Sequence, residues 1–175
     1  MILMHDIRFE RVHPTDLTTL QTLAATTFEH AFAVYNTPED MQQYMAEAFS
    51  TQRIKAELSH PEMVYYFARV GEVLAGYIKL NEFSAQTDLK DPESLELERI
   101  YVTADFQNQG IGKYLLEKSI ELAREGGKKF LWLGVWDQNH GAIRFYQRHG
   151  FTKFATHDFY LGKDRQTDFL MRIDT

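Results

Sequence analysis

Polar and apolar residues recur with different periods along the chain, and these periods predict where its strands and helices lie. Leu95 to Val102 is a short, apolar-rich run typical of a strand, and Tyr114 to Glu125 repeats its apolar residues at close to the 3.6-residue interval of a helix. The apolar positions of that helix are Leu115, Leu116, Ile120, Leu122 and Ala123. A polar turn, Thr103 to Gln109, and the segment Gly110-Ile-Gly112 join the two elements.

The rest of the pattern predicts a mixed α/β chain. Strands are expected at Ile7 to Val12, Val64 to Val70, Val73 to Leu80, Phe130 to Trp136, Phe154 to Leu161 and Thr167 to Ile173. Helices are expected to begin at His13 to Asp16, at Asn36 to Asp40 with Thr37 as N-cap, again near Thr51, and after Asn139. Asn81 to Ser94 is the one long loop and a candidate mobile lid.

Composition limits the class of protein. The 175 residues fit one domain, 1–175, and 44% of them are hydrophobic. The absence of cysteine excludes disulfides, zinc thiolate sites and a cysteine that carries an acyl group. The chain has neither an 18-residue apolar run nor a secretory leader pattern, so we expect a cytoplasmic protein that does not bind membranes. Its net charge of −6 argues against nucleic-acid binding and is compatible with a cationic substrate.

The glycine-bearing turn before the helix is a candidate anion site. A helix N-terminus presents unpaired N–H groups and a positive dipole end, and glycine lets a ligand approach the backbone closely. A Walker loop is excluded because Gln107 and Tyr114 stand where glycine and Ser or Thr are needed. A dinucleotide fingerprint is excluded because Leu115 stands where its third glycine is needed.

The motif Gln107-Asn-Gln-Gly-Ile-Gly112 resembles the Gln/Arg-x-x-Gly-x-Gly/Ala pyrophosphate loop of the GNAT superfamily of N-acetyltransferases. Asn139-His-Gly-Ala-Ile-Arg-Phe-Tyr146, followed by Gly150-Phe151, is similar to the second motif of that family. The resemblance covers roughly Ile7 to Ile173. Leu95 to Val102, Trp132 to Trp136 and Gln166 to Met171 look closest to the PaiA-type polyamine acetyltransferases of bacteria.

This resemblance implies the GNAT fold, an α/β (α+β) architecture with a mixed, twisted central sheet and helices on both faces. The element order β-α-α-β-β-β-α-β-α-β-β is the one expected of it. Acetyl-CoA would be the co-substrate, without a metal. The expected cofactor-binding residues are Ile100, Tyr101, Val102, Gln107, Asn108, Gln109, Gly110, Ile111, Gly112, Lys113, Asn139, Ala142 and Tyr146. A homodimer is left open.

Acetyl transfer to an amine requires a proton acceptor, because an alkyl amine with a pKa of about 10 is almost fully protonated at neutral pH. Glu98 is the candidate base, with substrate ammonium binding or a structural role as alternatives. The two-residue period of a strand places Glu96 and Glu98 on one face and Arg99 on the other.

Two residues of the second motif have expected roles at the cofactor. In similar enzymes the phenol that corresponds to Tyr146 reaches the CoA sulfur and can protonate the leaving thiolate; the alternative is a tyrosine that only packs. Asn139 either binds the pantetheine arm or caps the helix that follows, since asparagine is a preferred N-cap.

The acceptor is less well defined by the sequence. The segments expected to form the acceptor wall contain the carboxylates Glu29, Glu39, Asp40, Glu47 and Glu82 and the aromatic residues Tyr35, Tyr44 and Phe83; ordinary solvated surface is the alternative for most of these carboxylates. The preferred function is acetylation of a small primary amine, spermidine or spermine, by direct attack in a ternary complex. Alternatives are an amino acid or peptide N-terminus as acceptor, and a regulatory protein that senses acyl-CoA without turnover.

Overall fold

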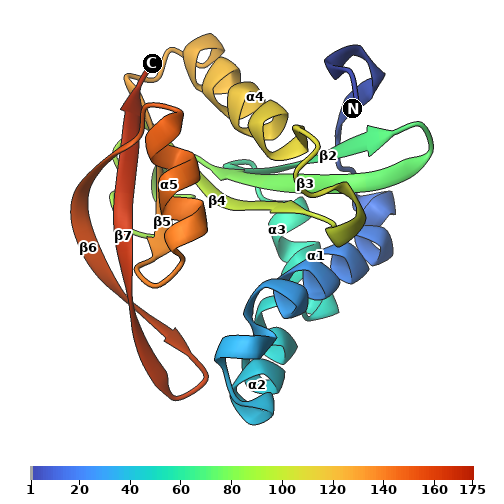
Figure 1. Cartoon of the computed structure of the whole chain (residues 1–175), viewed down its shortest axis with the longest axis vertical. Helices are drawn as coiled ribbons and strands as arrows, with labels where there is room; N and C mark the ends of the chain where they lie inside the picture. The colour runs from blue at the N-terminus through green and yellow to red at the C-terminus, as the bar shows by residue number, and fades with distance from the viewer. Residues whose placement is uncertain (1) are drawn as a thin grey trace.

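The computed structural model describes residues 2–175, and these residues form one seven-stranded sheet in the order β1-β2-β3-β4-β5-β7-β6 (Figure 1). All neighbouring strands are antiparallel except β4 and β5. The strands are β1 (Ile7–Arg11), β2 (Met63–Val70), β3 (Val73–Asn81), β4 (Ser94–Val102), β5 (Phe130–Trp136), β6 (Thr152–Leu161) and β7 (Asp164–Asp174).

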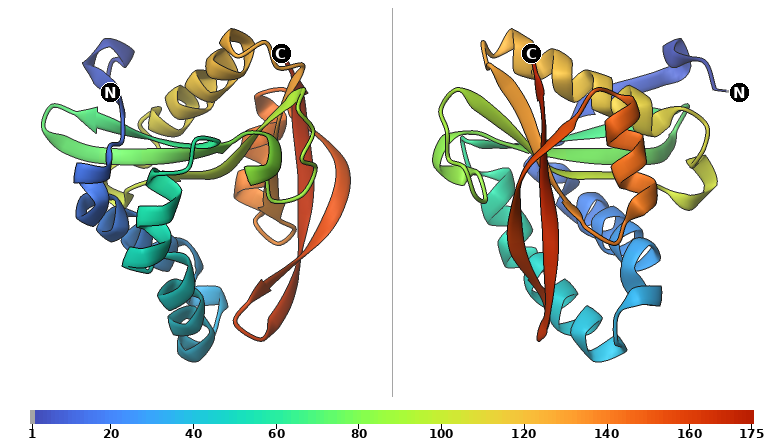
Figure 2. Two further views of the ribbon diagram at one scale, coloured as in Figure 1. Left: turned by 180° about the vertical axis from the view of Figure 1, so that it is seen from behind. Right: turned by 60° about the vertical axis from the view of Figure 1, so that its left-hand side comes forward.

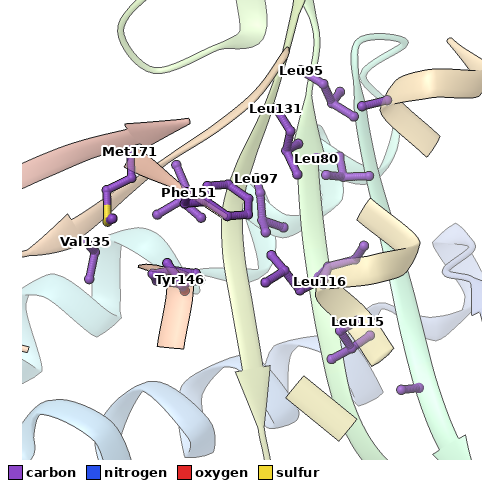
Figure 3. Packing of buried hydrophobic residues seen from close by; sticks show 14 of the residues in the cluster. Leu80, Leu95, Leu97, Leu115, Leu116, Leu131, Val135, Tyr146, Phe151 and Met171 are labelled. Carbon is purple, nitrogen blue, oxygen red and sulfur yellow. The ribbon is translucent and has the colours of Figure 1, made fainter. Parts of the chain in front are cut away.

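Helices cover both faces of the sheet, as Figures 1 and 2 show. One face carries α1 (Leu17–Phe32), α2 (Pro38–Ala48) and α3 (Thr51–Leu58), and the opposite face carries α4 (Ile111–Glu125) and α5 (His140–Arg148). Helix α4 is amphipathic, and its Leu115 and Leu116 are fully buried against the sheet (Figure 3). Figure 3 also shows Tyr146 of α5 and Phe151 in this core.

The expected architecture and element order are confirmed, with one addition. The segment expected to restart near Thr51 is a separate helix, α3, because Ser50 caps it by accepting a hydrogen bond from the amide of Arg53 at 3.2 Å. Thr37 caps α2 as expected, accepting from the amide of Asp40. Among residues 2–175, no helix is both long enough and apolar enough to cross a membrane.

Strands β4 and β5 part from each other in the middle of the sheet. Within the described chain they pair only where Ser94 to Glu96 lies beside Phe130 to Trp132. Beyond this point, β4 continues beside β3 and β5 continues beside β7. The parting leaves the inner backbone edges of both strands without strand partners, which allows a ligand to lie between them.

The prediction that Arg99 lies on the opposite face of its strand from Glu98 is wrong, because β4 contains a β-bulge. The register steps from Lys79 opposite Arg99 to Leu80 opposite Leu97, so Glu98 is an extra residue on β4. The extra residue breaks the two-residue alternation and brings Glu98 and Arg99 to the same face. Arg99 contacts α2 on that face, where its Nη2 donates to the hydroxyl of Tyr44 at 3.2 Å.

The long loop between β3 and β4 is fastened to the sheet rather than poised as a lid. The buried Gln86 accepts hydrogen bonds through Oε1 from Trp132 Nε1 at 2.7 Å and from Ser94 Oγ at 2.8 Å. Its Nε2 donates to the carbonyl of Asp91 at 2.9 Å. At the loop's end, Lys128 Nζ donates to the carbonyl of Pro92 at 3.1 Å. These bonds hold the loop against β4 and β5.

Candidate active site

A cavity of about 370 Å³ lies where β4 and β5 part. Because β5 side chains alternate, Leu133 and Val135 belong to the core under α4 and α5, whereas Gly134 and Trp136 face the opposite side. The cavity is lined from both faces of the sheet, by Tyr146 and Ala142 of α5 on one and by residues of α1, α2, β6 and β7 on the other. Two reactants could therefore approach the parting from opposite faces. We call the face of α1, α2, β6 and β7 the acceptor face.

The start of α4 has the local geometry that an anion site requires. Gly110 is the N-cap with a φ of +88°, a left-handed conformation that favours glycine, and no side chain caps the helix. The amides of Ile111, Gly112 and Lys113 precede the first helical hydrogen bond, from Tyr114 to Gly110. A Cβ atom at Gly112 would have no contact closer than 3.7 Å. These amides fit a pyrophosphate group.

The structure separates the expected cofactor-binding residues into two groups. The first lines the cavity and consists of Ile100, Tyr101, Val102, Gln107, Asn139, Ala142 and Tyr146. The second, Asn108 to Lys113, lies at the start of α4 outside the cavity lining. The side chain of Ile111 is fully buried in the core, so only its backbone is available to a ligand.

Tyr146 lies on α5 with 8% of its surface exposed and lines the cavity. Its ring packs against Phe145 and Phe151, with centroids 5.4 and 5.8 Å away. Burial raises the pKa of Tyr146, so the phenol is fully protonated at neutral pH, and no described side chain hydrogen-bonds to it. Asn139 caps α5, accepting from the amide of Ala142 at 3.2 Å, and its side chain also faces the cavity.

Glu98 faces the cavity but is tied to a buried ion network. Its Oε2 lies 2.5 Å from Lys79 Nζ and 2.6 Å from Asn81 Nδ2. Lys79 is 1% exposed and also contacts Glu57 of α3 at 3.1 Å. Burial alone would raise the pKa of Glu98, but the charges of Lys79 and Arg99 outweigh it and lower that pKa. Glu98 is therefore a permanent anion at neutral pH.

The carboxylates expected at the acceptor wall lie elsewhere: none of Glu29, Glu39, Asp40, Glu47 and Glu82 is among the described residues that line the cavity. Asp40 accepts from the amide of Lys163, which joins α2 to the turn between β6 and β7, and Glu82 pairs with Lys128. Of the expected aromatic residues, only Tyr44 lines the cavity. The element on which an acid lies does not by itself show whether its side chain lines the cavity.

Other carboxylates take their place on the acceptor face: Asp88 from the long loop, Glu96 from β4 and Asp168 from β7, beside Glu98. Burial is the main cause that raises the pKa of Glu96, and it raises that of Asp168 to about 6. His157 of β6 also lines the cavity, and its Nδ1 lies 3.2 Å from Asp88 Oδ2. The sequence signal for Asp168 was a charged residue inside an apolar C-terminal strand.

No group of three His, Cys, Asp or Glu residues within residues 2–175 is arranged to hold a metal ion. The site consists of a phenol, backbone groups on two parted strands, a helix N-terminus and several carboxylates. This combination can bind a pyrophosphate-bearing thioester on one face and an ammonium group on the other.

Comparison with known proteins identifies the family of the chain. The model of the acetyltransferase (GNAT) family matches residues 21–151. An uncharacterized N-acetyltransferase in the pepI 3′ region of Lactobacillus delbrueckii subsp. lactis is 40% identical over 169 residues, which cover 97% of this chain and 98% of the relative. The spermidine N(1)-acetyltransferase of Thermoplasma acidophilum is 24% identical over 149 residues, covering 83% and 88% of the two chains.

Among solved structures, the PaiA N-acetyltransferase of Thermoplasma acidophilum in complex with coenzyme A has the same fold, with a TM-score of 0.77 and 22% identity. The match covers 97% of this chain and 99% of that one. The family model spans well over half of the sequence, and the resemblance first seen at Gln107 to Gly112 is thereby confirmed at the level of the family. The chain belongs to the GNAT family and is an acetyl-CoA-dependent N-acetyltransferase.

Proposed function

We propose that the acceptor is a small cationic amine, with a polyamine such as spermidine or spermine as the preferred class. The observation that carries this proposal is the charge of the acceptor face. Asp88, Glu96, Glu98 and Asp168 line the cavity there, and Arg99 is the one lysine or arginine among the described lining residues; Lys79, outside the lining, pairs with Glu98. Separated carboxylates with aromatic neighbours suit an elongated cation that carries several ammonium groups.

The residues have distinct roles in this proposal. The amides at the start of α4 hold the pyrophosphate of acetyl-CoA, and the parted edge of β4 at Ile100 to Val102 pairs with its pantetheine arm. Tyr146 donates a proton to the sulfur as it leaves. Glu98, a fixed anion beside Lys79, orients the ammonium group of the acceptor. Its lowered pKa makes it a weak base, so the orienting role is favoured over proton abstraction.

The experiment is an amine panel that follows release of the CoA thiol. Spermidine and spermine should be acetylated with higher kcat/KM than a monoamine of similar length, an amino acid or a peptide. The KM for spermidine should rise clearly between low and high salt, because the contacts between separated charges are screened. The KM for the monoamine, which makes fewer such contacts, should change less.

Two results would overturn the proposed acceptor class. One is the absence of thiol release above background with both polyamines, while an amino acid or peptide N-terminus is acetylated. Arg99 would then be the group on the acceptor face that receives the substrate carboxylate. The other is a salt dependence that is the same for spermidine and the monoamine.

A further inference from the structure

Asp168 is unlike the other carboxylates of the cavity. Glu98 is paired with Lys79, Glu96 accepts hydrogen bonds from Asn81 and Thr87, and Asp88 contacts His157. The carboxylate of Asp168 makes no hydrogen bond or ion pair with any residue from 2 to 175, although it is largely desolvated. A charged group kept in this state is costly to the fold, and such groups cluster at functional sites.

The strand next to Asp168 leaves room for its carboxylate. Asp168 lies on β7, and a Cβ atom added at Gly134 of β5 would lie 3.4 Å from its Oδ2. Any longer side chain at position 134 would fill the space beside this oxygen. Gly134 lies two residues beyond Trp132, the last residue of β5 that pairs with β4. The carboxylate of Asp168 therefore lies beside the point where the two strands part.

Asp168 and Tyr146 reach the cavity from opposite faces of the sheet. Tyr146 belongs to the core under α4 and α5, whereas Asp168 stands on the face to which Gly134 is open. A thioester held between the parted strands would have a proton donor on one side and an unpartnered carboxylate on the other. This is the arrangement that amine attack from the acceptor face requires.

We propose that Asp168 is the catalytic residue that removes the proton from the acceptor ammonium. This inference rests on the proposed function in one respect, that the acceptor arrives as a protonated amine. The first ammonium proton passes to Asp168 and from there to solvent. The nitrogen lone pair forms the C–N bond, and the C–S bond breaks with its electrons going to sulfur. Tyr146 protonates the sulfur and recovers the second proton that the nitrogen loses.

The groups around Asp168 suit a proton acceptor. The pKa of Asp168 is raised to about 6, mainly by burial and in smaller part by Asp137, which follows β5, while His157, its register partner on β6, acts to lower it. The other charged groups that line the cavity are Asp88, Glu96, Glu98 and Arg99. A base with a pKa near 6 is ionised at neutral pH yet is more basic than an ordinary aspartate.

The test is the pH dependence of spermidine acetylation by the wild-type protein and the Asp168→Asn variant. The wild-type kcat/KM should fall on the acid side with an apparent pKa near 6. The variant should lose about a hundredfold or more in kcat at neutral pH, together with that acid limb. Its kcat with trifluoroethylamine, which is already neutral at pH 7.5, should stay within a few-fold of the wild-type value.

Two neighbours of Asp168 provide matched controls. Asp137→Asn removes a negative charge and should shift the acid limb to lower pH. His157→Gln removes the side chain that lowers the pKa of Asp168 and should shift the limb to higher pH. Opposite shifts show that the limb belongs to a group near both residues, because a loss of structure would not move it in two directions, and the loss of the limb in Asp168→Asn identifies that group.

The outcomes separate this inference from the proposed function. If the wild-type protein acetylates no amine on the panel, the proposed acceptor class fails before Asp168 is tested. If it acetylates spermidine and Asp168→Asn keeps both kcat and the acid limb, Asp168 is not the proton acceptor. The inference is also wrong if the variant raises KM but leaves kcat unchanged, or if kcat falls as much with trifluoroethylamine as with spermidine. Asp168 would then bind substrate or shape the site without taking the proton.

Discussion

Two carboxylates of the same cavity have opposite surroundings, and their chemistry differs accordingly. Lys79 and Asn81 hold Glu98 in place and lower its pKa, whereas the carboxylate of Asp168 has no polar partner among residues 2–175 and a pKa of about 6. The ion-paired Glu98 therefore suits orientation of an ammonium group, and Asp168 suits proton transfer. Pairs of groups whose pKa values are pushed apart commonly divide work in this way.

A single-residue change tests the proton donor. Tyr146→Phe keeps the ring and its packing against Phe145 and Phe151 but removes the hydroxyl. We expect kcat to fall about a hundredfold, because a general acid contributes at least that much. Affinity for acetyl-CoA, measured by calorimetric titration, should change by less than about threefold. Turnover near the wild-type rate, when chemistry limits it, would show that Tyr146 only packs.

At this scale the sequence reveals some site residues and conceals others. Tyr146 and Gly110 stand in local motifs, so their neighbours along the chain identify them. Asp168 becomes a site residue only because β7 pairs with β5 beside Gly134, and that pairing joins distant parts of the chain. The ion pair of Glu98 with Lys79 likewise depends on the register between β3 and β4. No local pattern carries this information.

Among the elements, α4 was the most predictable, because its apolar repeat and its glycines are both local signals. The strand β4 was predicted in place but not in detail. Its bulge at Glu98 inserts one residue and reverses the expected face of Arg99. A bulge depends on how two strands pair, so period-two reasoning fails at that residue and is correct on either side of it.

The N-terminus of α4 gives a test at the scale of an element. Gly112→Asp places a negative charge at the amides that hold the pyrophosphate, so acetyl-CoA affinity should fall at least a hundredfold. Gly112→Ala is the matched control, since its Cβ would meet only ordinary contacts with Phe145 and Val102 at 3.7 and 3.8 Å. Calorimetric titration should show a much smaller loss for alanine. Equal losses would mean that space, and not charge, matters at this position.

For the whole molecule, Asp168 couples the site to stability. Its pKa is raised from about 3.9 in an unfolded chain to about 6 in the fold, so the folded protein keeps a proton that the unfolded chain has lost between these values. The free energy of unfolding therefore falls as pH rises from about 4 to 6, and the full loss of stability due to Asp168 is present above pH 6.

Asp168→Asn removes that loss of stability. We expect the variant to have a higher free energy of unfolding than the wild-type protein at pH 7.5, with the difference shrinking toward pH 4.5. Urea unfolding at the two pH values measures it. A gain of the same size at both values would mean that the side chain's shape, and not its charge, is responsible.

The parting of β4 and β5 has a further consequence for the free protein in solution. A sheet of this order has two outer edges, at β1 and β6, and the parting opens two more inside the molecule. Unpaired strand edges are templates for the addition of foreign strands and thus for aggregation. A ligand arm that pairs with these edges closes them, and any ligand that binds only the folded state also stabilises it. Coenzyme A should therefore act as a solubilising agent for this protein, apart from its part in the reaction.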